Sequence, residues 1–287
     1  MQIKVENLSY VYSEKSKSLA VKALDDVTLT INEGEFFGIV GRTGSGKSTF
    51  IQHLNGLIRV GKNKGKLLIG EYDLTSKKCD FKGLRAKVGM IFQYPEYQLF
   101  AETVYEDVAF SLKNFYPKMT EKERFDRVKD AISMVGLDFE KVEDKSPFDL
   151  SGGQKRRVAI AGVLASSPEV LVLDEPLAGL DPKGKREFTK LLHDLKNTVV
   201  KTIIIVSHDM DFVAENCTSV AVFDAGKIVK IGTPKQVFSS HDEVESLGLN
   251  LPVCAEVLIK LDLLEQAENL KEETVVSLVK KHLGGER

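Results

Sequence analysis

The sequence predicts an α/β fold: a mainly parallel sheet, an antiparallel β subdomain, an inserted α-helical subdomain and a small helical C-terminal extension. Strand-like and helix-like segments alternate along most of the 287 residues, as they do when helices connect parallel strands. Several strand-like segments are apolar at every position, which is typical of strands covered on both faces. One of these segments leads directly into a glycine-rich turn at residues 41–48.

The N-terminal third begins with alternating patterns. Apolar residues recur at alternate positions in 3–12 and 20–31, which predicts two antiparallel strands. The run FFGIV at 36–40 predicts a buried strand, and a helical pattern extends from Ser48 to Leu57. Two more strand-like pieces follow at 66–70 and 88–92.

Helical patterns dominate the middle of the chain and its C-terminal end. Residues 103–135 predict helices interrupted at Pro117, and a helix capped by Ser151 is expected over 151–166. The pattern becomes mostly helical again after Pro234. The remaining elements are expected at 169–174 (strand), 182–198 (helix), 203–207 (strand) and 220–232 (hairpin).

These patterns divide the chain into two parts. We expect a main α/β domain over 1–238, with its helical subdomain at about 98–166. A helical C-terminal extension is expected over 239–287, because a polar junction at 239–242 separates it from the preceding hairpin. No internal repeat or low-complexity segment interrupts this organisation.

The composition narrows the classes of partner. The net charge of −2 gives no general attraction to nucleic acid or to an anionic membrane. No apolar run is long enough to span a bilayer, and no apolar segment of a signal peptide follows Met1, so we expect synthesis in the cytosol. Three scattered cysteines, Cys79, Cys217 and Cys254, favour small buried thiols over a disulfide framework or a metal cluster.

The turn GRTGSGKS fits the phosphate-loop pattern G-x4-G-K-[ST], between a buried strand and a helix. Glycines let the backbone curl so that successive N–H groups point at phosphates, and the helix N-terminus adds its positive end. Lys47 is expected to reach the β and γ phosphates, and the Ser48 hydroxyl to bind Mg²⁺. This predicts a P-loop NTPase fold of the RecA-like type. The predicted ATP-binding residues are Tyr12, Gly41, Arg42, Thr43, Gly44, Ser45, Gly46, Lys47, Ser48 and Thr49.

Polar residues at the ends of three other strands complete a catalytic set. Asp174 and Glu175 follow the buried run VLVL, so we expect Asp174 near the Mg²⁺ and Glu175 beside an attacking water. His208, after IIIVS, is expected to contact the γ-phosphate, with a core histidine as the alternative. Gln93 ends another strand and could reach both the Mg²⁺ and the water. Lys47, Gln93, Glu175 and His208 are thus the predicted catalytic residues, and Ser48, Gln93 and Asp174 the metal site, partly through water.

Several aromatic residues have two possible roles. Tyr12 could stack on adenine, or it could be an ordinary surface or core tyrosine. Tyr94, Tyr97, Leu99 and Phe100 lie in the loop after Gln93, where Pro95 prevents a helix from starting. They could form a docking groove for another protein, or they could simply pack in the core.

A second glycine-rich motif, LSGGQ at 150–154, lies far from the phosphate loop. The order GRTGSGKS, Gln93, LSGGQ, VLVLDE, AGLD and His208 resembles the ATPase subunit of ABC transporters over about residues 1–235. The resemblance implies that two such domains pack head to tail around ATP. One chain would then supply half of each of two sites. The residues expected to act on the partner's nucleotide are Ser151, Gly152, Gly153 and Gln154, and Asp181 is expected to bridge the subunits.

Further segments resemble the ATPases of energy-coupling factor (ECF) transporters, which import vitamins and trace metals. These are FQYPEYQLF at 92–100, RRVAIAGVLA at 156–165 and LDPKGK at 180–185, and the paired arginines suggest the second of the two ATPase types. The resemblance implies a similar but non-identical ATPase partner, with a homodimer as the alternative. It also implies a transmembrane scaffold, a membrane substrate-binding subunit and a peripheral position on the cytoplasmic face. Leu177 departs from the Thr or Ser that more often follows Glu-Pro.

Four other classes of protein share some of these motifs. An ATPase of another ABC importer class shares all the principal motifs. DNA-repair relatives need a long coiled coil between the phosphate loop and LSGGQ, and the span 49–149 is too short for one. Translation relatives carry two cassettes in one chain, and a phosphate-loop kinase would explain neither LSGGQ nor His208.

Overall fold

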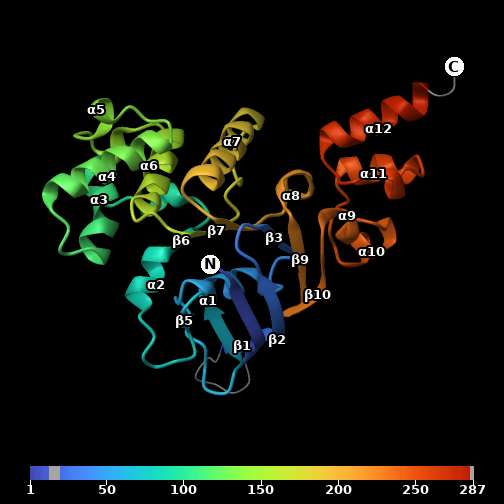
Figure 1. Cartoon of the computed structure of the whole chain (residues 1–287), viewed down its shortest axis with the longest axis horizontal. Coiled ribbons are helices and arrows are strands. Elements are labelled where there is room, and N and C mark those ends of the chain that lie inside the picture. Colours follow the sequence, from blue (N-terminus) through green and yellow to red (C-terminus); the bar gives the residue numbers. More distant parts are fainter. Residues whose placement is uncertain (13–19, 285–287) are drawn as a thin grey trace.

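A computed structural model describes residues 1–12 and 20–284 of the chain (Figure 1). The last three residues of the predicted C-terminal extension, 285–287, lie outside the described residues. Figure 1 shows two sheets in the centre and lower part of the molecule. The helical subdomain and the C-terminal extension lie on opposite sides, with α7 (Pro182–Thr198) and α8 (Met210–Asn216) between them.

A six-stranded sheet forms the centre of the described part of the chain, in the order β10-β9-β3-β8-β7-β6. All neighbours are parallel except the C-terminal hairpin, which confirms the predicted mainly parallel sheet. Ligands of such sheets bind beyond the carboxyl ends of the strands. The strands are β3 (Phe36–Gly41), β6 (Val88–Ile91), β7 (Val170–Asp174), β8 (Thr202–Val206), β9 (Ser219–Asp224) and β10 (Lys227–Gly232).

The innermost strands are buried on both faces. Phe36 and Val40 of β3 pack with the helices of the helical subdomain and α7, whereas Phe37 and Ile39 face the antiparallel sheet and α1. The side chains of β7 and β8 alternate in the same way between the two cores. This double burial explains why these strands read as unbroken apolar runs.

The second sheet is antiparallel, as the alternating N-terminal pattern predicts, and has the order β2-β1-β4-β5 in the described residues. Two helices join it in one apolar core. One of them, α2, follows the cap residue Asp80 and is not predicted from the sequence. The bounds are β1 (Ile3–Tyr12), β2 (Val21–Ile31), β4 (Lys66–Ile69), β5 (Tyr72–Asp73), α1 (Lys47–Leu54) and α2 (Phe81–Lys87).

The helical subdomain is inserted between β6 and β7, as predicted. Pro117 lies between its first two long helices, and the second of these starts with a capping box at Thr120. A second capping box, at Ser151, starts the helix that follows the LSGGQ motif. The elements are η2 (Pro95–Gln98), α3 (Val104–Phe115), α4 (Glu121–Met134), α5 (Phe139–Val142), η3 (Pro147–Asp149) and α6 (Gly152–Leu164).

The C-terminal extension consists of short helices packed beside α8. Val244, Leu249 and Leu258 of this region belong to the same apolar core as Phe212 and Val213 of α8. Among the residues described, no helix is both long enough and apolar enough to cross a membrane. The helices after β10 are α9 (Pro234–Val237), α10 (His241–Ser246), α11 (Val253–Lys260), η4 (Leu264–Gln266) and α12 (Glu272–Gly284).

Candidate functional site

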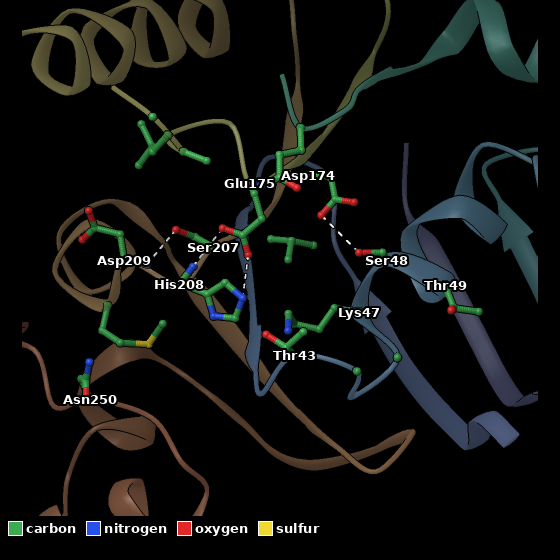
Figure 2. Close-up of a pocket in the computed structure, with 18 of the residues that line it drawn as sticks. Thr43, Lys47, Ser48, Thr49, Asp174, Glu175, Ser207, His208, Asp209 and Asn250 are labelled. Carbon is green, nitrogen blue, oxygen red and sulfur yellow. Dashed lines mark hydrogen bonds and ion pairs between the residues drawn. The ribbon is translucent and has the colours of Figure 1, made fainter. Parts of the chain in front are cut away.

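A cavity of about 1080 Å³ lies beyond the carboxyl ends of β3, β6, β7 and β8. Four predicted motifs meet there, although Thr43 and His208 lie 165 positions apart in the chain. Figure 2 shows Lys47, Ser48, Asp174, Glu175 and His208 around this cavity. Among the predicted site residues, Tyr12, Thr43, Gly44, Gly46, Lys47, Ser48, Thr49, Gln93, Asp174, Glu175 and His208 line it.

The phosphate loop owes its shape to two glycines. Gly41 has φ 147°, and a Cβ atom there would lie 2.2 Å from the carbonyl oxygen of Phe223. Gly46 has φ 102° and caps α1, and a Cβ atom there would lie 2.3 Å from the carbonyl oxygen of Ala23. Any side chain at either position would therefore displace the backbone.

Lys47 is buried inside this loop. Its Nζ donates to the carbonyl oxygens of Gly41 (2.7 Å) and Arg42 (2.9 Å). Burial lowers the pKa of Lys47, and the nearby carboxylates of Glu175 and Asp174 oppose that change. Two neutral acceptors compensate a buried ammonium poorly, so an anion in the cavity would be a better partner for Lys47.

The carboxylates at the end of β7 are desolvated. Burial raises the pKa of Asp174, while the Ser48 hydroxyl, 3.4 Å from Asp174 Oδ1, lowers it. Burial also raises the pKa of Glu175 to about 7, although the backbone N–H of His208 and the charge of Lys47 oppose the increase. A carboxylate with a pKa near 7 is suited to accept a proton at physiological pH.

The backbone around Glu175 is strained. Glu175 has φ 48°, in the left-handed region that non-glycine residues rarely adopt. Its N–H donates to the carbonyl oxygen of Val206 at 3.0 Å, which ties the end of β7 to the end of β8. Such strain of about 1–3 kcal/mol is tolerated where the surrounding structure fixes the conformation, as it often does at functional sites.

His208 lies against Glu175. Its backbone N–H donates to Glu175 Oε2 (3.3 Å), and its Nε2 lies 3.1 Å from Glu175 Oε1. Burial lowers the pKa of His208, and the positive charge of Lys47 lowers it further. His208 is half exposed toward the cavity, so the alternative of a core histidine is not the one observed.

The donor set fits a magnesium ion. Ser48 and Asp174 offer oxygen atoms on the same side of the cavity, and the buried Asp174 has no cationic partner within salt-bridge distance among the described residues. Mg²⁺ prefers oxygen ligands and keeps several sites for water and phosphate. No group of three or more His, Cys, Asp or Glu side chains in the described ranges could hold a metal by itself.

The LSGGQ residues do not line this cavity. Ser151 caps α6 by accepting from the N–H of Gln154, and the Gln154 side chain accepts from the N–H of Ser151 at 3.1 Å. Ser151, Gly152 and Gly153 are exposed, and a Cβ atom at either glycine would meet nothing within 4 Å. The positive end of α6 thus faces open space. Asp181 is also exposed and accepts from the N–H of Gly184 as the cap of α7.

The loop after Gln93 is mostly exposed, with one exception. Tyr94, Tyr97 and Phe100 are 39%, 84% and 60% exposed. Leu99 is only 6% exposed and packs in the core of the helical subdomain, so the expectation that it lines a groove is wrong. Tyr94 has φ 54° and precedes the short turn η2, and Leu99 follows that turn.

Sequence reasoning missed a buried arginine that joins three motif loops. Arg156 of α6 is 7% exposed and donates through Nη1 and Nη2 to the carbonyl oxygen of Ala178, both at 3.3 Å. Its Nε lies 3.9 Å from Glu96 Oε2 in η2. The helix after LSGGQ, the loop after Glu175 and the loop after Gln93 therefore meet at one guanidinium. The pair of adjacent arginines at 156–157 is the sequence feature from which a role for Arg156 could have been inferred.

Other cavity residues were also missed. Lys185 forms an ion pair with Asp209 (2.7 Å), and both residues line the cavity. Asn250 and Leu251 of the C-terminal extension line it as well. Gly41, Arg42 and Ser45 belong to the predicted loop but lie outside the lining. Asp209 could have been recognised as the cap before the apolar start of α8.

Known proteins resemble the chain over most of its length. The ABC transporter family matches residues 24–178. The energy-coupling factor transporter ATP-binding protein EcfA2 of Clostridium tetani is 49% identical over 284 residues, which cover 99% of this chain and 96% of the relative. The structure of cbiO1 from Clostridium perfringens, part of the ABC transporter complex cbiONQ, has a TM-score of 0.72 and 39% identity, covering 90% and 98% of the two chains.

The ATP-binding cassette MJ0796, in a dimeric post-hydrolysis state bound to ADP and Pi, has a TM-score of 0.70 and 30% identity. The match covers 81% of this chain and 98% of that chain.

The raised pKa of Glu175 predicts a pH-dependent stability. Because the folded chain holds a proton on Glu175 up to about pH 7, its free energy of unfolding should fall as the pH rises from about 4.5 to 7. Above pH 7 the ionised carboxylate should cost about 3 kcal/mol. Glu175→Gln should therefore stabilise the nucleotide-free chain at pH 8, measured by urea unfolding from pH 5 to 8. Glu102→Gln, at an exposed position, is the control. If the free energy of unfolding depends on pH in the same way in wild type and in Glu175→Gln, that result would contradict the raised pKa of Glu175.

Proposed function

The chain belongs to the ABC transporter family, and we propose that it is the ATP-hydrolysing subunit of an ECF-type importer for vitamins or transition-metal ions. The named relatives support the ECF type. The proposed substrate class follows from that type, in which a separate membrane subunit selects the substrate. The proposed position is peripheral, on the cytoplasmic face of the membrane.

One observation carries the proposed mechanism: the LSGGQ cap faces open space, away from the cavity that holds the other motifs. A γ-phosphate bound by Lys47 would have donors on one side only. A second ATPase packed head to tail would supply its own signature helix to the other side. The N–H groups and positive end of that helix would complete the phosphate cage. The exposed Ser151, Gly152 and Gly153 of this chain would serve the second nucleotide in the same way.

Each residue of the cavity then has a distinct task. The phosphate loop and Lys47 bind the β and γ phosphates, and Tyr12 stacks on adenine. Ser48, Gln93 and Asp174 hold Mg²⁺, partly through water. When bound, the ion would neutralise part of the phosphate charge. Glu175 orients the attacking water and accepts its proton, while His208 contacts the γ-phosphate and holds Glu175 in place.

The partners follow from the same arrangement. We propose a similar but non-identical ATPase as the second subunit, with Asp181 near the junction. The exposed aromatic side chains of Tyr94, Tyr97 and Phe100 would receive a transmembrane scaffold protein. A membrane substrate-binding subunit would complete the transporter. Arg156 connects this docking surface to the loop after Glu175, so that closure of the ATPase pair can be transmitted to the scaffold.

The role of Glu175 is tested by Glu175→Gln. The variant keeps the acceptor for the His208 N–H but loses the base. It should bind ATP normally and lose about 10²–10⁴-fold in hydrolysis rate when assembled with its partners. A phosphate-release assay on the assembled transporter measures this loss. Hydrolysis at a near wild-type rate would show that another group positions the water.

The action of the signature in trans is tested by Gly153→Asp. A Cβ atom at this exposed position would meet nothing within 4 Å, so folding and ATP binding by the isolated chain should be unchanged. A carboxylate beside the opposite subunit's γ-phosphate should abolish ATP-driven pairing, measured by analytical ultracentrifugation. Gly284→Asp, at an equally open position in α12, is the matched control. Loss of ATP binding by the isolated Gly153→Asp chain would instead show that the signature acts in cis.

The docking surface is tested by Tyr97→Ala and Leu99→Ala. Tyr97→Ala should leave folding and ATP binding intact and weaken recruitment to membranes that contain the scaffold, because Tyr97 is 84% exposed. Leu99→Ala should lower the free energy of unfolding by about 2–5 kcal/mol, because Leu99 is buried. Leu283→Ala, at an exposed position in α12, is the control for losing surface apolar area. Normal recruitment of Tyr97→Ala in a flotation assay would refute this surface.

A further inference from the structure

Arg42 belongs to the phosphate loop, but its side chain points away from the nucleotide cavity. Its guanidinium donates through Nε to the carbonyl oxygen of Leu247 (3.1 Å) and through Nη2 to that of Ser246 (2.9 Å). These acceptors lie in the C-terminal extension, more than 200 residues away in the sequence. The backbone carbonyl of the same Arg42 accepts from Lys47 Nζ. One residue therefore contacts both the phosphate-binding lysine and the extension.

The two carbonyl groups are the ones that the end of α10 leaves without a partner. The N–H of Gly248 bonds to the carbonyl of Glu245, and the N–H of Leu249 bonds to that of Val244. This pattern is a Schellman motif, which satisfies two of the last helical carbonyl groups. The carbonyl groups of Ser246 and Leu247 follow these two in the chain and are not satisfied by the motif. They lie at the negative end of the helix, where a cation is favoured.

Gly248 makes room for the guanidinium. It has φ 67°, and a Cβ atom there would lie 2.0 Å from Arg42 Nε. A larger residue would thus be strained in its backbone and would also exclude Arg42 from the helix end. Gly248 of the extension and Arg42 of the phosphate loop are therefore sterically complementary.

The next residues of the extension form part of the cavity wall. Asn250 and Leu251 line the nucleotide cavity (Figure 2 labels Asn250 at its edge). The N–H of Val253 then donates to Asp211 Oδ1 of α8 at 2.7 Å. The segment 246–253 is therefore held at one end by the phosphate loop and at the other by the helix that follows His208.

We propose that Arg42 is a positioning residue that latches segment 246–253 to the phosphate loop, so that nucleotide binding and docking of the C-terminal extension stabilise each other. Coupling between two sites is reciprocal. The latch should therefore raise nucleotide affinity, and bound nucleotide should protect the extension from opening. This inference rests on the proposed nucleotide site but assigns a new task to the extension.

The test uses the full-length isolated chain and a fluorescent ATP analogue with Mg²⁺. Arg42→Ala should raise the Kd by about five- to tenfold, because two charge-assisted hydrogen bonds are lost. In wild type, nucleotide should slow hydrogen exchange at the amides of residues 248–251 and of Val253. This protection should largely disappear in Arg42→Ala. Arg42→Lys, which keeps the charge but has one donor nitrogen, should lie between the two.

The substitution Gly248→Ala tests the same contact from the side of the C-terminal extension. It should also weaken nucleotide binding, because the new Cβ atom displaces Arg42. In the Arg42→Ala background, Gly248→Ala should raise the Kd much less than it does in wild type. The guanidinium that the new Cβ atom would displace is already absent there. Arg127→Ala, at an exposed position in α4, is the arginine control.

The outcomes separate the latch from the proposed function. Wild-type affinity together with unchanged nucleotide-dependent protection in Arg42→Ala would overturn the latch and leave the ATPase function standing. Additive effects of Arg42→Ala and Gly248→Ala would also overturn it. Absence of nucleotide binding by wild type would instead contradict the proposed function. If Arg42→Ala does not fold, Arg42→Lys and Gly248→Ala decide the same question.

Discussion

The buried carboxylates of Asp174 and Glu175 impose the constraint on which the rest of the site depends. They stand at the end of a strand that is covered on both faces, and this burial disfavours their charged forms. Lys47 is the nearby cation, yet its own hydrogen bonds go to two carbonyl groups of the phosphate loop. The site is therefore electrostatically incomplete as it stands. A Mg²⁺ ion and a polyphosphate would supply the missing charges in the place where both carboxylates and Lys47 point.

The incomplete nucleotide site also gives a physical reason for two ATPase subunits to pair. Gly152 and Gly153, at the N-terminus of α6, face open space, and neither residue lines the cavity that contains Lys47. In the proposed assembly, a second subunit completes each of the two half-sites, so nucleotide binding would favour association of the subunits. Arg156 and Arg42 extend this coupling within the chain. The first joins the loops around the site to the exposed aromatic surface, and the second joins the phosphate loop to the C-terminal extension.

Much of this arrangement is predictable from local sequence. The buried strands, the phosphate loop and the capping box at Ser151 each depend on residues within a few positions of one another, and the structure has them where they are expected. Short helices such as α2 and α8 carry too few residues for a periodic pattern to be recognised. Leu99 is buried with apolar residues of the helical subdomain that lie far from it in the sequence, and Tyr94 before it adopts a left-handed conformation that tyrosine rarely adopts. The contacts of Arg42 and Arg156 join distant segments, and no local pattern indicates them.

The central claim is that each nucleotide lies between the phosphate loop of one subunit and the signature of the other. The most direct measurement is the structure of the Glu175→Gln chain assembled with its partner ATPase and Mg²⁺-ATP. We predict that the γ-phosphate beside Lys47 accepts hydrogen bonds from the signature of the opposite subunit, and that Ser151 contacts the other nucleotide. A γ-phosphate contacted by Lys47 and Ser151 of the same chain would contradict the account.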